Sequence, residues 1–275
     1  MTISVGLSDA GGEEVAMRAS REPLLRIDDV SVRFGGVRAL DGVTCQVNEG
    51  EICGLIGPNG AGKTTLFNCI TRLYPVASGS IAFAGTRIDT IPARRIIALG
   101  IARTFQNLGI YPDMTVLENV LLGAHHSHGG RFFRTVIRPF AADAQERRMT
   151  EWCRSVLRAL DLDRFADARA GNLPYGTLKR VEIARALTAR PRLLLLDEPA
   201  AGLNHGERVE FAGLITRIRD EFKLTVLLVE HQMGLVMGLC GRLLVLHLGR
   251  LLAEGTPAEV SANPAVVSAY LGEAA

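Results

Sequence analysis

A glycine-rich segment with one lysine and two threonines carries the clearest chemistry in the sequence. Residues 57–65 read Gly-Pro-Asn-Gly-Ala-Gly-Lys-Thr-Thr, a full match to the pattern G-x-x-x-x-G-K-[ST]. Glycines let backbone N–H groups point inward around a phosphate, and the helix that follows adds a favourable dipole. Lys63 then pairs with β and γ oxygens, and the Thr64 hydroxyl can ligate Mg²⁺. The predicted phosphate-binding residues are Gly57, Pro58, Asn59, Gly60, Ala61, Gly62, Lys63, Thr64 and Thr65.

Two apolar segments end in residues that can act on a bound phosphate. The run Leu193–Leu196 is followed by Asp197 and Glu198, and the run 225–229 leads to His231. Alone, two acids after a buried strand are as often ordinary surface groups, but ligands of open α/β sheets gather at the carboxyl ends of strands. Beside a phosphate loop, we therefore expect Asp197 to hold Mg²⁺ through water and Glu198 to polarise an attacking water. His231 is predicted to contact a γ-phosphate.

The elements that must position these residues can be read from the apolar pattern. Short β-rich runs predict strands at 24–32, 43–47, 51–56, 80–83, 193–197, 225–230, 243–247 and 251–254. Helical spacing predicts helices at 63–72, 118–122, 144–160 and 178–189. The chain is thus strand-rich, then helical, then alternating. This order indicates an α/β core with an inserted helical lobe from about residue 88 to 176.

Composition excludes several classes of protein. The 275 residues are 48% hydrophobic and 22% charged, which is enough to bury one large core without disulfides or a structural metal. A net charge of +2 gives no bulk electrostatic case for nucleic acid, and no apolar run approaches the roughly 18 to 20 residues that span a bilayer. Five scattered cysteines without a CxxC pair predict reduced core thiols in a cytosolic protein. Residues 1–21 lack any period and are predicted to form a disordered tail.

The ordered set of motifs resembles the ATPase subunits of ABC transporters over residues 22–273. Besides the motifs above, the resemblance rests on Gln106 in Arg-Thr-Phe-Gln and on the stretch Leu173-Pro-Tyr-Gly-Thr-Leu-Lys-Arg. It implies one ABC ATPase domain with a P-loop NTPase core, in which a mixed sheet has flanking helices and an antiparallel β subdomain. The α-helical subdomain, at about 88–176, is inserted in that core.

The resemblance also implies roles for single residues. Gln106 would sense Mg²⁺ and the permease, and so joins Thr64 and Asp197 as a metal-site residue. Phe34 would stack on the adenine of ATP, although an aromatic in a strand is often only a packing residue. The signature loop would close over ATP held by the opposite subunit, through Leu173, Tyr175, Gly176 and Thr177.

The signature loop departs from the commonest form of the family. Leu-Ser-Gly-Gly-Gln becomes Leu173-Pro-Tyr-Gly-Thr, which removes the serine hydroxyl but keeps Gly176 at the start of a helix. Asn204 stands where an aspartate is common. Both changes, together with the ending at 263–272, resemble the branched-chain amino-acid importer branch.

The resemblance implies an ATPase that uses ATP and Mg²⁺ at the cytoplasmic face of a membrane, as a peripheral subunit. Its partners would be integral-membrane permease subunits, a second ATPase (a paralogue or an identical copy) and, indirectly, a substrate-binding protein, with no nucleic acid. A urea or amide importer, a lipid or lipopolysaccharide exporter and a soluble ABC ATPase are the alternatives. Residues 125–128, rich in histidine, and the basic stretch 131–138 are predicted to be a solvated loop and an exposed insertion, respectively.

Overall fold

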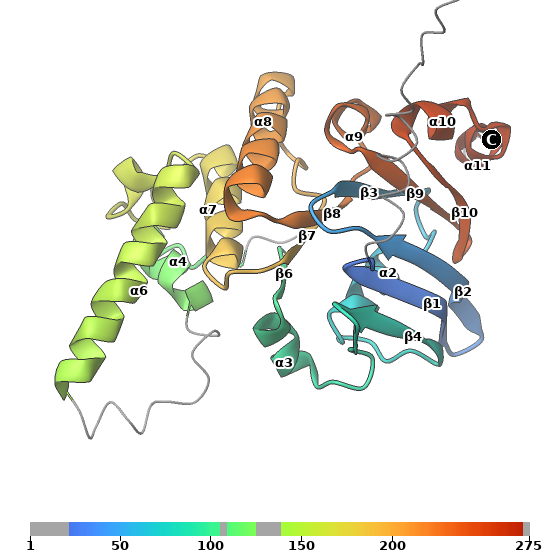
Figure 1. Ribbon diagram of the computed structural model, residues 1–275. Helices are drawn as coiled ribbons and strands as arrows, with labels where there is room; N and C mark the ends of the chain where they lie inside the picture. Colours follow the sequence, from blue (N-terminus) through green and yellow to red (C-terminus); the bar gives the residue numbers. More distant parts are fainter. Residues whose placement is uncertain (1–21, 105–108, 125–138, 272–275) are drawn as a thin grey trace, which may run out of the picture.

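The fold is built on two sheets, seen in a computed structural model that describes residues 22–104, 109–124 and 139–271 (Figure 1). The larger sheet has six strands in the order β10-β9-β3-β8-β7-β6. Five of its strands run parallel, and β10 pairs antiparallel with β9. The bounds are β3 Ile52–Ile56, β6 Ile101–Arg103, β7 Leu193–Asp197, β8 Thr225–Val229, β9 Arg242–His247 and β10 Arg250–Gly255.

The smaller sheet has four antiparallel strands in the order β2-β1-β4-β5. Its strands are β1 Leu25–Phe34, β2 Val37–Val47, β4 Ser78–Phe83 and β5 Thr86–Arg87. The mixed sheet and the antiparallel subdomain that the sequence predicts are therefore both confirmed. The predicted strands 43–47 and 80–83 are longer in the structure, while β5 and β6 have no counterpart among the predicted strands.

The central strands are buried on both faces. Every residue of β3, β7 and β8 is buried, as expected for near-continuous apolar runs in a parallel sheet. Alternate residues of β7 enter different cores: Leu194 and Leu196 pack with the larger group of helices, whereas Leu193 and Leu195 pack toward the antiparallel sheet. The six-stranded sheet thus separates two cores and contributes to both.

The helices divide between these two cores (Figure 1). Helix α2 packs toward the antiparallel sheet, and α4, α6, α7, α8 and α9 contribute to the other core. The bounds are α2 Lys63–Ile70, α3 Ala93–Ile96, α4 Val116–Ala124, α6 Pro139–Ala159, α7 Tyr175–Leu187, α8 His205–Phe222, α9 Met233–Leu239, α10 Pro257–Ala262 and α11 Pro264–Leu271.

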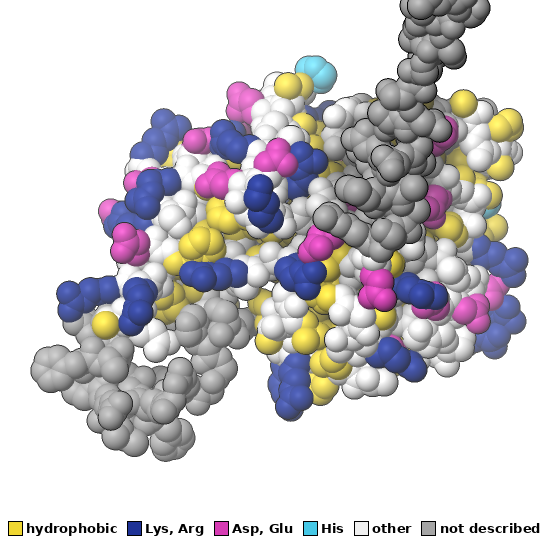
Figure 2. Space-filling view, viewed as in Figure 1, with side chains coloured by type: hydrophobic (Ala, Val, Ile, Leu, Met, Phe, Trp, Pro, Cys, Tyr) yellow, Lys and Arg dark blue, Asp and Glu magenta, His cyan; other side chains and the backbone are white. Residues whose placement is uncertain are grey.

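Helices α4, α6 and α7 pack against one another and form the helical part of the molecule, at the left of Figure 1. The range 88–176 expected for the helical subdomain ends within α7. It includes β6, which pairs with β7 in the core sheet, and α7 continues to Leu187. On the face shown in Figure 2, acidic side chains lie among the basic ones over the helical part.

The five cysteines are buried and unpaired, as predicted for core thiols: Cys45, Cys53, Cys69, Cys153 and Cys240. Burial raises the pKa of the Cys45 thiol to about 12 and that of Cys69 to about 11. These thiols are protonated at neutral pH, so they are poor nucleophiles.

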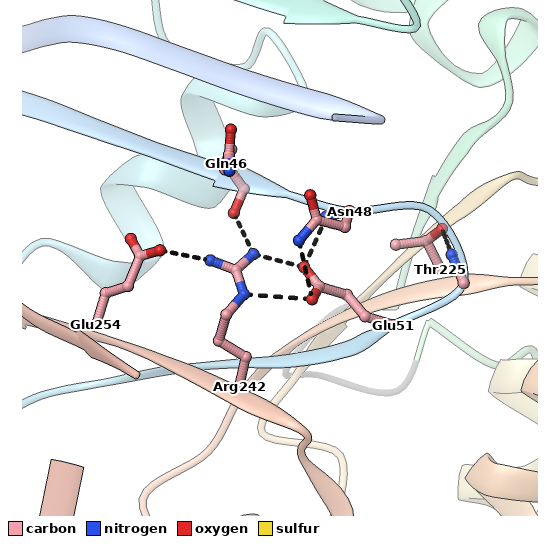
Figure 3. A network of polar contacts seen from close by, with 7 residues as sticks. Gln46, Asn48, Glu51, Thr225, Arg242 and Glu254 are labelled. Atoms are coloured by element: carbon pink, nitrogen blue, oxygen red, sulfur yellow. Dashed lines mark hydrogen bonds and ion pairs between the residues drawn. The ribbon is translucent and has the colours of Figure 1, made fainter. Parts of the chain in front are cut away.

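Arg242, the first residue of β9, joins the two sheets (Figure 3). Its guanidinium contacts both carboxylate oxygens of Glu51, at 2.6 and 3.2 Å, and Glu254 at 2.8 Å. It also donates to the carbonyl oxygen of Gln46 in β2, at 2.7 Å. Burial opposes the charge on Arg242, but these carboxylates raise its pKa above the ordinary value. One side chain thus ties β2 to β3, β9 and β10.

We expect Arg242→Met to lower the free energy of unfolding by about 2–3 kcal/mol, because it leaves Glu51 partly buried without its cation. Urea unfolding followed by circular dichroism measures this. The control is Arg250→Met: Arg250 pairs with Asp41 at 2.6 Å, but its side chain is 70% exposed, so we expect a loss of about 0–1 kcal/mol. Equal losses in the two variants would contradict a special role for Arg242.

Candidate functional site

The register of the parallel sheet brings three predicted motifs to one edge. Leu55 of β3 pairs with Val229 of β8, and Val229 pairs with Asp197 of β7. The phosphate loop, the two acids after β7 and the residues after β8 therefore begin level with one another. This is the carboxyl edge of the sheet, where ligands of open α/β folds bind.

Two glycines of the phosphate loop are fixed by close backbone contacts. Gly57 has φ +150°, and a Cβ there would lie 2.1 Å from the carbonyl oxygen of Leu246. Gly62, the N-cap of α2, has φ +105°, and a Cβ there would lie 2.7 Å from the carbonyl oxygen of Ala39. Both positions require glycine on conformational and steric grounds. The loop is thus pressed between β9 and β2.

Lys63 lies across the loop that it follows. Its Nζ donates to the carbonyl oxygens of Gly57 and Pro58, at 2.7 and 2.8 Å. Thr64 is exposed at the start of α2, and a Cβ at Gly60 would meet open space. The loop therefore presents a lysine, a hydroxyl and a helix N-terminus on its accessible side, which suits a phosphate with an associated cation.

Asp197 is held by a buried arginine that sequence reasoning did not assign. Arg103 Nη2 lies 2.7 Å from Asp197 Oδ2, with the two side chains 7% and 6% exposed. Its Nη1 donates to Asn68 Oδ1 at 2.6 Å, and its guanidinium lies 5.5 Å from the ring of Phe67. Arg103 thus joins the acid after β7 to helix α2. The only signal in the sequence is its place in Arg-Thr-Phe-Gln, two residues after the start of β6.

Glu198 and His231, from the ends of two neighbouring strands, lie close together. His231 Nδ1 lies 3.9 Å from Glu198 Oε1 and 3.6 Å from Glu230 Oε2. Glu198 has φ +46°, an uncommon conformation for a non-glycine residue. Its side chain is 27% exposed, so water can reach it.

Glu230 organises this edge and was also missed at the sequence level. Its side chain is fully buried, and its two carboxylate oxygens accept from the backbone N–H groups of Ala200 and His231, at 3.3 and 2.8 Å. A buried carboxylate that joins two loops by backbone hydrogen bonds fixes their relative position. A carboxylate directly before His231 was the available signal.

Phe34 lies at the end of β1 with its ring 46% exposed. The ring of Tyr74 meets it edge-on, with centroids 5.0 Å apart. Tyr74 follows α2 and donates from its backbone N–H to Asn68 of that helix. The exposed side of Phe34 is thus held near the helix of the phosphate loop, in an arrangement suited to stacking on a flat ring.

The signature residues begin helix α7, as predicted, with Pro174 as its N-cap. Leu173 is the C-cap of the short 3-10 helix Ala170–Asn172. The backbone N–H of Thr177 donates to the carbonyl oxygen of Pro174 at 3.0 Å. Tyr175 is 43% exposed.

The signature loop packs against the loop before α8. A Cβ at Gly202 would lie 2.9 Å from the ring of Tyr175, and one at Gly176 would lie 3.3 Å from Glu207 Oε1. Asn204 caps α8 by accepting from the N–H of Glu207 at 3.0 Å, while Glu207 accepts from the N–H of Asn204 at 2.8 Å. Asparagine is as good an N-cap as aspartate. The unusual residue at 204 therefore has a structural role.

Three sequence-level expectations lie outside the described residues: the role of Gln106, the segment 125–138 and the tail 1–21. The described chain stops at Thr104, whose N–H donates to Leu195 at 3.0 Å. It resumes at Gly109, whose carbonyl oxygen accepts from Arg185. Among the residues that the structure describes, no helix is long and apolar enough to cross a membrane. Within the same residues, no group of three or more His, Cys, Asp or Glu side chains is placed to hold a metal ion.

The fold and the site define a P-loop nucleoside triphosphatase. The sequence comparisons identify the family: the family model described as ABC transporter matches residues 40–201. A second model, described as branched-chain amino acid ATP-binding cassette transporter, matches residues 250–275. The chain therefore belongs to the ABC transporter family, as an ATP-binding subunit and ATPase coupled to transport, and the resemblance seen in the sequence is confirmed.

Relatives and solved structures match nearly the whole chain. The chain is 42% identical to the high-affinity branched-chain amino acid transport ATP-binding protein BraF of Pseudomonas aeruginosa, over 92% of this chain and 99% of BraF. It is 40% identical to the protein of the same description, LivG, of Escherichia coli K12, with the same coverage. A crystal structure of the ADP conformation of MJ1267, an ATP-binding cassette of an ABC transporter, has a TM-score of 0.79 at 31% identity, covering 92% of this chain and all of MJ1267.

We expect Arg103→Met to lower kcat for ATP hydrolysis by about tenfold or more, because Asp197 loses the cation that orients it. Steady-state ATPase assays over a range of Mg²⁺ concentrations measure this, at a temperature where circular dichroism shows the variant folded. Arg94→Met is the control, because Arg94 lies exposed on α3. A kcat within twofold of the wild type in Arg103→Met would exclude this role.

Proposed function

We propose that this chain is the ATPase subunit that energises an importer of branched-chain or other hydrophobic amino acids. The observation that carries the proposal is the match of residues 250–275 to the branched-chain amino acid cassette model, on a chain 40–42% identical to BraF and LivG over 92% of its length. The departures Tyr175 and Asn204 support the same branch. The subunit would act at the cytoplasmic face of the membrane, bound to its permease.

ATP would be held by residues 57–65, with the ring of Phe34 against the adenine. Lys63 Nζ, which now bridges two carbonyl oxygens of its own loop, would turn to the β and γ oxygens. The helix N-terminus at Gly62 supplies N–H groups and a favourable dipole for the phosphates. The crowded glycines on either side keep the loop in the shape that this requires.

Mg²⁺ fits the residues that the sequence predicts for it. Thr64, Gln106 and Asp197 would hold the ion, directly or through water, and hydroxyl, amide and carboxylate oxygens are the donors that Mg²⁺ prefers. Arg103 pairs with Oδ2 of Asp197, which orients the other oxygen for this task. When bound, the ion neutralises charge on the β and γ oxygens.

Glu198 would orient and deprotonate the water that attacks the γ-phosphate, and His231 would contact that phosphate. The 3.9 Å between Glu198 Oε1 and His231 Nδ1 lets both side chains face one reacting group. Glu230 fixes the backbone on both sides of the pair. Hydrolysis thus relies on groups at the ends of two neighbouring strands.

The site would be completed by a second ATPase subunit, a paralogue or an identical copy. In this proposal Leu173, Tyr175, Gly176 and Thr177 close over ATP that the partner holds, and the partner does the same in return. ATP then joins two subunits, and its hydrolysis separates them. The permease subunits would contact the helical part near Gln106, and a substrate-binding protein would deliver the amino acid to the permease.

We expect Glu198→Gln to retain ATP binding and to lose steady turnover by about 10² to 10⁴, because the base is removed while the phosphate loop is intact. Binding of a fluorescent ATP analogue and phosphate release by the purified complex measure the two effects separately. Glu221→Gln is a matched acid-to-amide control at an exposed position of α8. Turnover of Glu198→Gln comparable to the wild type would remove Glu198 from the mechanism.

We expect deletion of the gene to abolish high-affinity uptake of radiolabelled leucine, isoleucine and valine, since a permease without its ATPase is not energised. Complementation with the wild-type chain should restore uptake, and complementation with Lys63→Ala should not. Normal uptake of all three amino acids with loss of urea or amide uptake would overturn the cargo and keep the transporter. Sensitivity to DNA damage with normal transport of each solute would point to a soluble ABC ATPase instead.

A further inference from the structure

A stripe of charged side chains runs along helix α7. Lys179, Glu182 and Arg185 follow one another at intervals of three residues, so they lie on neighbouring turns. The side chains of Lys179 and Glu182 are only 2% and 3% exposed. Lysine and glutamate are almost never buried so completely unless they are paired. We therefore expect both side chains to have partners inside the fold.

Lys179 and Glu182 are in contact, and the charge of Glu182 acts on Arg185. Lys179 Nζ lies 4.0 Å from Glu182 Oε2. Burial lowers the pKa of the Arg185 guanidinium, and the charge of the Glu182 carboxylate opposes this shift. An apolar stripe of equal volume would pack at least as well, because buried ion pairs add little net stability. Ionic contacts at these positions therefore constrain the orientation of the side chains more than they add stability.

Each end of the stripe contacts a different loop. At the start of α7, Lys179 Nζ lies 5.6 Å from the centroid of the Tyr175 ring, and this ring covers the backbone of Gly202. Toward the end of the helix, the Nη1 of Arg185 donates to the carbonyl oxygen of Gly109. The stripe thus spans the distance between the signature loop and the chain three residues after Gln106.

The segment after Gly109 is itself tied to the helical part. The N–H of Tyr111 donates to Asn119 Oδ1 at 2.8 Å, and Asn119 Nδ2 donates back to the carbonyl oxygen of Tyr111 at 3.0 Å. Asn119 is fully buried in α4. Close backbone packing joins α4 to α7, since a Cβ at Gly123 would lie 2.0 Å from the carbonyl oxygen of Arg185.

We propose that Lys179, Glu182 and Arg185 act as one positioning unit that fixes the signature loop relative to the chain at Gly109. A displacement at either loop is then transmitted to the other along α7. The meaning of this coupling rests on the proposed function, in which Tyr175 meets the partner's ATP and Gln106 meets the permease. The coupling itself is a property of the single chain and can be measured without either partner.

The test is hydrogen–deuterium exchange of the full-length chain. Lys179→Met keeps the approximate length of the side chain and removes its charge. We expect the exchange rate in residues 109–115 to rise at least about threefold, because loss of a stabilising contact makes local opening more frequent. The reciprocal variant, Arg185→Lys, is expected to raise exchange in residues 174–178, because coupling between two sites is mutual.

Arg180→Met is the matched control. Arg180 follows Lys179 directly but pairs with Glu210 of α8, at 3.1 Å. We expect it to leave exchange in residues 109–115 unchanged. A change confined to residues 174–182 in Lys179→Met would overturn the proposal, and so would an equal rise at 109–115 in Arg180→Met.

A second pair of variants decides the case if Lys179→Met does not fold. Tyr175→Phe keeps the ring above Lys179, whereas Tyr175→Ala removes it from a half-exposed position at low cost in stability. We expect exchange at 109–115 to rise in the alanine variant and not in the phenylalanine variant. The same exchange in both variants would overturn the positioning unit.

Kinetics separate this proposal from the proposed function. In the purified complex, Lys179→Met should lower kcat by about tenfold through misplacement of the signature loop. Binding of a fluorescent ATP analogue to the single chain should stay within twofold of the wild type, because the phosphate loop packs in the other core. A wild-type complex that does not hydrolyse ATP would refute the proposed function, while the exchange data would still decide on the positioning unit. Equal tenfold losses of ATP binding and kcat would refute the positioning unit alone.

Discussion

The parallel pairing of β3, β8 and β7 is the constraint on which the rest of the site depends. Hydrogen bonds between these buried strands set Leu55, Val229 and Asp197 level with one another. A shift of register by one residue would turn every side chain to the other face. It would also move each leucine of β7 from one hydrophobic core to the other. Packing on both faces therefore fixes the register of these strands. That register sets the phosphate loop, Asp197, Glu198 and His231 at the same edge of the sheet.

Much of this arrangement is visible in the sequence because the strands concerned are uniformly apolar. The runs 193–197 and 225–229 suit strands buried on both faces, and the predicted bounds agree with β7 and β8 within one residue. β6 was missed because it is an edge strand of three residues, Ile101–Arg103, whose pairing depends on β7. The first half of β2 was missed because Arg38 and Asp41 are not typical of a strand. Its pairing with β1 supplies what the local sequence does not.

The residues of the candidate site likewise divide into those that a local motif predicts and those that only tertiary packing brings together. The glycines, Lys63 and the acids after β7 follow motifs of fixed spacing, so they were found. Arg103 was not, because its partner Asp197 lies 94 residues away and nothing local marks the pair. The contact between Tyr175 and Gly202 is likewise a product of tertiary packing. Pairs of residues from distant elements are what a single sequence cannot reveal.

The cap of α8 limits what can stand at position 176 of the signature loop. Asn204 and Glu207 hold each other in a reciprocal cap, and Gly176 lies against the carboxylate of Glu207. A Cβ at 176 would meet Glu207 Oε1 at 3.3 Å, so the capping carboxylate would have to shift by a few tenths of an ångström. The signature loop and the start of α8 are therefore in direct mechanical contact. A substitution at 176 acts on a second helix as well as on its own loop.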